Sequence, residues 1–172
     1  MKNQCYAHET ARTIQAVRCC NGDLTIALVA DSHLDNSVPV TVGNISAVDR
    51  AVHFDCCVHL GDFLAGEIGG RYAGRLLRQQ LSLFPAAISS GRFFPVQGNH
   101  DACSGPCSGK LWPEAIRFLD AEEDVRRPAQ KPYYYVDIAK EQVRLVFLCS
   151  YYYKQHSGEP VIIFGYEESQ IH

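Results

Sequence analysis

The sequence contains no cluster of lysine and arginine, no low-complexity segment and no apolar run of the length that a membrane span requires, which is roughly 18 residues. The N-terminal stretch MKNQCYAHETARTIQ lacks the apolar core of a secretory signal peptide. We therefore expect a cytoplasmic protein that does not enter a membrane. The net charge of −3 and the absence of a basic patch give no sign of a face that binds the nucleic-acid backbone.

Eight cysteines stand out in a composition that is otherwise ordinary for a globular protein, with 47% hydrophobic and 20% charged residues. Cys19–Cys20 and Cys56–Cys57 are adjacent pairs, and neighbouring residues on a strand point to opposite faces. We expect reduced, mostly buried thiols rather than disulfides. The 172 residues are enough for one domain with a real core, so we expect residues 1–172 to form a single domain.

Short apolar runs alternate with segments of helical periodicity, which predicts an α/β fold. LTIALVA at 24–30 is a continuous apolar run with β-branched residues, as in a strand that is buried on both faces. Further strands are predicted at 54–60, 93–96 and 161–164, and a hairpin at 133–138 and 143–151. Helices are predicted near 7–17, 44–52, 72–88 with an interruption at Pro85, 113–119, and from 165 onward.

Polar side chains follow each of the first three predicted strands. The strand at 24–30 leads into Asp31-Ser32-His33, the strand at 54–60 into Gly61-Asp62, and the strand at 93–96 into Gly98-Asn99-His100-Asp101. The intervening segments are long enough for strand–helix–strand crossovers, so these strands can be parallel. The carboxyl ends of parallel strands share one edge of a sheet, where ligands bind, so we expect the three groups to converge.

Oxygen and imidazole donors of this kind suit Mn, Fe, Zn or Co. Asp31 and His33 are two residues apart and can chelate one ion together. Asp62 can bridge two ions through its two carboxylate oxygens, and Gly61 and Gly98 allow sharp turns and close backbone approach. Taken singly, each group is more often an ordinary turn or surface pair than a metal site, because Gly-Asp is a common turn dipeptide and Gly-Asn-His-Asp also suits a hairpin turn. All three in this order at strand ends arise by chance far less often.

The three groups, in this order, resemble the first three signature motifs of the calcineurin-like metallophosphoesterases, and the match runs from about residue 24 to the end of the chain. The resemblance implies an α/β fold of the βα-sandwich type and a hydrolase with two divalent metal ions. Such an enzyme hydrolyses a phosphate mono- or diester with water activated between the two metals. The substrate would thus be a phosphate ester, and monoesters, diesters, nucleotides and phosphoproteins all stay open.

The resemblance also implies a role for each site residue. Asp31 and His33 would bind the first ion, Asp62 would bridge the pair, and Asn99 would bind the second ion. His100 would be the catalytic imidazole beside the scissile bond, and Asp101 would orient it.

The sequence departs from the family pattern after these motifs. Relatives supply further histidines, whereas only His156 and His172 follow His100 here. We expect neither to be a ligand, because His156 lies in a polar stretch at 154–159 that resembles an exposed loop and His172 lies at a predicted helix start. The chain is therefore expected to correspond to the N-terminal half of such an enzyme, with weak metal binding, negligible turnover on its own and self-association through an exposed apolar edge.

Two other interpretations remain open. The chain could be a truncated or inactive relative that binds metal without turnover. It could also be a zinc-binding or redox domain built on Cys103 and Cys107, although their spacing favours a loop beside the site. His53 and His59 are predicted to be packing residues on or beside the second strand.

Overall fold

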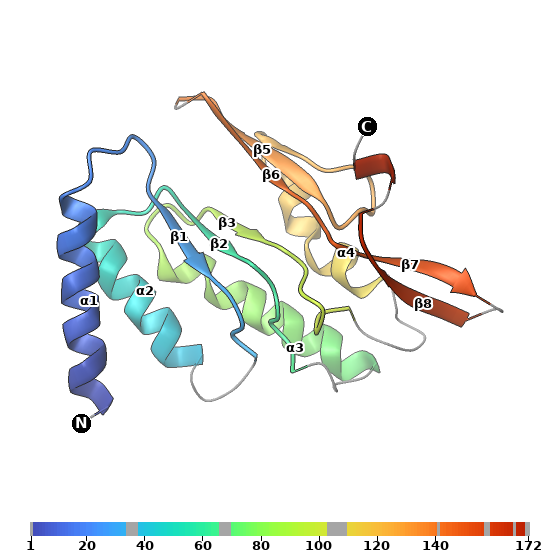
Figure 1. Cartoon of the computed structure of the whole chain (residues 1–172), viewed down its shortest axis with the longest axis horizontal. Coiled ribbons are helices and arrows are strands. Elements are labelled where there is room, and N and C mark those ends of the chain that lie inside the picture. The colour runs from blue at the N-terminus through green and yellow to red at the C-terminus, as the bar shows by residue number, and fades with distance from the viewer. Residues whose placement is uncertain are drawn as a thin grey trace.

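The computed structural model describes residues 2–33, 38–65, 70–102, 110–140, 142–156, 159–166 and 168–170. The described chain is mixed α/β, with a parallel sheet first, an antiparallel sheet after it and a hairpin near the C-terminus (Figure 1). Within these ranges, helices that combine the length and apolar character of a bilayer span are not found.

The parallel sheet comprises the three strands that the sequence predicts before the polar groups. These are β1 (Ile26–Val29), β2 (Cys56–His59) and β3 (Phe93–Pro95), with β2 in the centre. Val29 pairs with His59, and His59 pairs with Pro95. All three strands therefore end at the same level, and the loops that follow them begin side by side.

Helices connect the strands as the crossovers require. α1 (Lys2–Arg18) and α2 (Val38–Val52) pack together, and α3 (Gly70–Leu83) leads into the short 3₁₀ turn η1 (Pro85–Ala87). The predicted interruption at Pro85 is confirmed. The predicted start of the second helix near Asn44 is wrong, because α2 already begins at Val38. Pro39 lies in its first turn, where a missing N–H costs no helical hydrogen bond.

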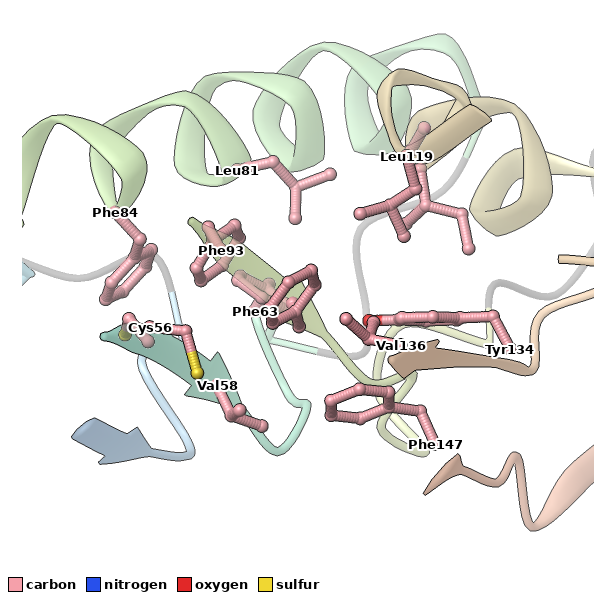
Figure 2. Close-up of a cluster of buried hydrophobic side chains, with 14 of the residues drawn as sticks. Cys56, Val58, Phe63, Leu81, Phe84, Phe93, Leu119, Tyr134, Val136 and Phe147 are labelled. Atoms are coloured by element: carbon pink, nitrogen blue, oxygen red, sulfur yellow. The ribbon is translucent and has the colours of Figure 1, made fainter. Parts of the chain in front are cut away.

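A continuous core joins α3 to both sheets (Figure 2). Leu81 of α3 and Phe84, which directly follows α3, point toward Phe93 of β3. The Phe84 and Phe93 rings stack with centroids 5.4 Å apart. Phe63, which is fully buried, fills the space between α3 and the sheet. This packing fixes the position of the loop after β2 relative to α3.

The second sheet extends this core. After α4 (Leu111–Ala115) and η2 (Arg117–Ala121), the strands β4 (Val125–Arg126), β5 (Tyr134–Ile138) and β6 (Val143–Phe147) pair antiparallel. The predicted hairpin is confirmed as β5 and β6, whereas β4 was not expected. The Tyr134 hydroxyl donates a hydrogen bond of 2.9 Å to the Pro95 carbonyl, which ties this sheet to the end of β3.

The C-terminal segment differs from its prediction. β6 ends at Phe147 rather than at 151, and β7 (Tyr151–His156) pairs with β8 (Glu159–Phe164) in a separate hairpin. His156 is thus a strand residue and not part of a loop. The 3₁₀ turn η3 (Glu168–Gln170) lies where a helix start was predicted, and His172 lies outside the described residues.

Candidate metal centre

Three predicted site residues meet where the parallel strands end. Each of the three offers one donor atom, and these atoms lie within 4.8 Å of one another. The residues are His33, Asp62 and His100. The rings of His33 and His100 meet edge to face, with centroids 5.0 Å apart and an interplanar angle of 82°. All three residues are half-buried. The convergence that the order of the motifs predicts is therefore present for these residues.

Backbone hydrogen bonds keep the loops together beyond the ends of β1 and β2. The N–H of Asp31 donates to the Gly61 carbonyl and that of His33 to the Asp62 carbonyl, each over 3.0 Å. The side chains of the first and second motifs are thus held by a continuation of strand pairing, in addition to their own contacts.

The His33 ring is oriented by a backbone carbonyl. Its Nδ1 lies 3.0 Å from the Leu64 carbonyl oxygen and donates to it, which leaves a lone pair on Nε2. A carbonyl or carboxylate behind the imidazole is the usual support of a metal-binding histidine. Nε2 lies 3.5 Å from Oδ1 of Asp31, so the two atoms are close enough to be ligands of one cation. These donors fit a divalent cation.

Asp62 and His100 are joined by the backbone. Oδ1 of Asp62 accepts a hydrogen bond of 2.9 Å from the His100 N–H, and each carboxylate oxygen has two acceptor positions. Among the residues that the structure describes, Oδ2 and one position on Oδ1 therefore remain for a ligand, so the carboxylate can still bridge two ions. The contact also fixes the third motif against the second.

Two glycines make this approach possible. Gly61 has φ of +108°, and a Cβ there would lie 2.5 Å from the Gly98 nitrogen. A Cβ on Gly98 would lie 2.1 Å from Oδ1 of Asp62. Since real contacts are never this short, both positions require glycine if the loops are to touch, as the sequence predicted.

The backbone at the site is strained. Asp31, His33 and Asp62 have φ of 55°, 40° and 60°, in the left-handed region that side chains with a Cβ disfavour. Asp and His tolerate this region better than most residues. Strained residues that cluster at one place point to a role beyond folding.

The buried Asp101 carboxylate contacts the backbone of the loops after β2 and β3. Its Oδ1 accepts hydrogen bonds from the N–H groups of Phe63 and Leu64, and its Oδ2 accepts from Asp62 and Gly98, at 2.9 to 3.0 Å. These four bonds occupy the acceptor positions of the carboxylate and join the two loops. That Asp101 orients the His100 ring stays a prediction. Burial raises the pKa of Asp101 to about 6, and the backbone N–H groups oppose that shift.

The remaining predicted positions are less enclosed. Asp31 is exposed beside His33, and Asn99 is exposed in the turn between Gly98 and His100. Cys103 and Cys107 lie outside the described residues.

Both His53 and His59 were predicted to be packing residues, and only His59 is one. His59 is fully buried and stacks on Phe63, with ring centroids 3.7 Å apart. His53 is exposed with φ of 55°, because it ends α2 in the left-handed conformation of a helix terminus.

The two thiols of β2 offer little metal or redox chemistry. Cys56 and Cys57 in β2 are fully buried, and burial raises the pKa of their thiols to about 11 and about 12. Such thiols are poor nucleophiles and poor metal ligands. Cys19 and Cys20 are exposed at the end of α1, and all four are free.

A separate hollow of about 730 Å³ opens beside the second sheet, lined among others by Leu119, Tyr133 and Phe147. None of the three clustered donors lines it.

Comparisons of the chain with protein-family models, with curated proteins and with solved structures find no match.

Proposed function

We propose that the chain is a metal-dependent phosphoesterase that hydrolyses a phosphate mono- or diester, with the βα-sandwich of the calcineurin-like metallophosphoesterases. The observation that carries the proposal is the meeting of His33, Asp62 and His100 within 4.8 Å on the loops after β1, β2 and β3. The strained backbone at two of these residues supports it independently of any resemblance. We keep a cytoplasmic location as part of the proposal, supported by the four free thiols at Cys19–Cys20 and Cys56–Cys57.

The donors divide between holding metal and handling protons. Nε2 of His33 and the carboxylates of Asp31 and Asp62 would hold divalent cations, with the Asn99 amide oxygen as a further donor. When bound, two such cations would act as Lewis acids on phosphoryl oxygens and lower the pKa of water. His100 would donate a ring N–H proton to the oxygen that leaves phosphorus.

The proposal is tested first by metal binding. The chain is treated with EDTA, dialysed and titrated with Co²⁺, whose visible absorption reports nitrogen and oxygen ligands. We expect saturable binding that Asp62→Asn weakens by at least tenfold. Asp23→Asn is the matched control, because Asp23 is an exposed aspartate before β1, and it leaves binding unchanged. Equal binding by wild type and Asp62→Asn would refute the metal site.

Turnover is tested second, with p-nitrophenyl phosphate and its bis ester in the presence of Mn²⁺. Hydrolysis that is lost in Asp62→Asn supports the phosphoesterase. Metal binding without hydrolysis of either ester favours the second candidate, a metal-binding protein without turnover, which the same donor cluster supports.

A further inference from the structure

Behind the candidate metal centre lies a buried polar network that sequence reasoning missed. It consists of Ser32, His59 and Gln80, which are 6%, 0% and 0% exposed. Ser32 lies in the loop after β1, His59 at the end of β2 and Gln80 on α3. These residues are up to 48 positions apart, so the sequence gives no local signal of their contact.

Each side chain of the network accepts one hydrogen bond and donates the next one along the chain of bonds. The Gly61 N–H donates to Nδ1 of His59 over 3.2 Å, so Nε2 carries the ring proton and donates to Oγ of Ser32 over 3.0 Å. The Ser32 hydroxyl donates to Oε1 of Gln80 over 2.9 Å, and Nε2 of Gln80 donates to the Phe63 carbonyl over 2.6 Å. Burial lowers the pKa of His59 to about 3, which keeps the ring neutral as this pattern requires.

The network contacts the chain directly beside the candidate ligands. Ser32 lies between Asp31 and His33, and the bonded groups of Gly61 and Phe63 lie on either side of Asp62. The three candidate ligands among these residues are those with left-handed backbone. Such a conformation persists only where surrounding contacts determine it. Here the network supplies contacts to the neighbouring residues, beside the backbone hydrogen bonds of Asp31 and His33 and the bond from Asp62 to Asp101.

We propose that Ser32, His59 and Gln80 are positioning residues that hold the loops after β1 and β2 in the strained geometry that brings the metal donors together. The proposal deepens the proposed function and rests on it for the metal. The holding of the loops is a separate claim that needs no metal.

An apolar replacement in the network distinguishes the holding of the loops from a general contribution to folding stability. Gln80→Leu keeps the size of the side chain and removes both of its hydrogen bonds, which leaves the Ser32 hydroxyl and the Phe63 carbonyl without these partners. Gln79→Leu is the matched control, because Gln79 is the exposed neighbour on the same helix. Leu81→Ala, at a buried position of α3, is the control for lost stability without loss of the network.

The first readout uses the metal-free chain. Amide hydrogen exchange by NMR follows the N–H groups of Asp31 and His33, which bond to the β2 loop. We expect Gln80→Leu to speed their exchange about tenfold relative to amides of β2. Unchanged exchange at these two amides in a folded Gln80→Leu chain would overturn the inference. If Gln80→Leu does not fold, Ser32→Ala breaks the same chain of bonds and is judged by the same exchange.

The second readout is Co²⁺ affinity. We expect Gln80→Leu to weaken binding by about 10- to 100-fold, as outer-shell changes do, with both controls close to wild type. Weakening by Leu81→Ala to the same degree would show a merely structural effect and overturn the inference. Faster exchange in a chain whose wild type binds no Co²⁺ would instead remove the proposed function and leave the loop-holding role intact.

Discussion

Replacement of Gly98 by alanine tests the contact between the second and third motifs. The new Cβ would lie 2.1 Å from Oδ1 and 2.2 Å from the backbone nitrogen of Asp62, so one loop must move by about an ångström or more. Gly98 cannot withdraw freely, because its own N–H donates to Asp101 and its nitrogen faces Gly61.

The magnitude follows from the bonds that such a movement breaks. Three are at risk, from Gly98 and Asp62 to the Asp101 carboxylate and from His100 to the Asp62 carboxylate. Hydrogen bonds to charged groups contribute about 1.5 to 3 kcal/mol each, and partial relaxation recovers some of this. We expect Gly98→Ala to lower the free energy of unfolding by about 3 to 5 kcal/mol, a fall in Tm of roughly 10 °C.

Gly43→Ala is the matched control. Gly43 lies inside α2, and a Cβ there would meet nothing within 4 Å. The same substitution should stabilise the chain by about 0.5 to 1 kcal/mol, because alanine is the better helix former. Urea unfolding followed by circular dichroism measures both variants. A Gly98→Ala chain within 1 kcal/mol of wild type, with the same dependence on urea, would refute the close contact.

For three further changes the structure predicts the direction of the effect on stability, metal binding or turnover. Asp31→Gly relieves the left-handed backbone at an exposed residue, so it should raise Tm by a few degrees without metal and weaken Co²⁺ binding; a lower Tm would contradict the strain argument. Because the pKa of His59 is lowered to about 3 from 6.5, unfolding takes up a proton between these values, and His59 alone should lower stability by about 2 kcal/mol from pH 7 to pH 5. The raised pKa of Asp101 acts in the opposite direction in this window, because the folded state takes up that proton. The test is therefore a comparison by urea unfolding: from pH 7 to pH 5 wild type and His53→Asn should lose about 2 kcal/mol more stability than His59→Asn. If His100 transfers a proton, His100→Ala should keep Co²⁺ binding and lower turnover by about 10² to 10⁴-fold, whereas loss of the metal would make it a ligand.

The strands were predictable because their residues are mostly apolar. Burial on both faces holds for β2 and β3 but is wrong for β1, which lies at the edge of the sheet with Leu28 66% exposed. Cys56, Cys57 and Val58 alternate sides and are all buried, so the run reads as apolar throughout. The convergence of the motifs followed from the same prediction, since parallel strands share one edge. The β7–β8 hairpin was missed because Lys154, Gln155 and His156 are polar, although Ser-Gly between the two strands is a common turn dipeptide.

The hydrogen-bond partners could not be predicted. Asp101 binds four backbone N–H groups, which every residue except proline carries and which therefore leave no mark in the sequence. Gln80 lies beside the equally polar Gln79, and only the direction in which α3 faces the sheet distinguishes them. Long-range side-chain contacts of this kind depend on tertiary packing and have no local pattern.

The buried thiols of β2 also allow the opening of the core to be measured by cysteine alkylation. A short pulse of an alkylating reagent reaches Cys19 and Cys20 at once, since both are exposed at the end of α1. It reaches Cys57 only when the core around the central strand opens, because that thiol is fully buried. The ratio of the two labels, read by mass spectrometry from one sample, therefore measures how often the core beneath the candidate metal centre opens, with the exposed thiols of the same chain as the reference.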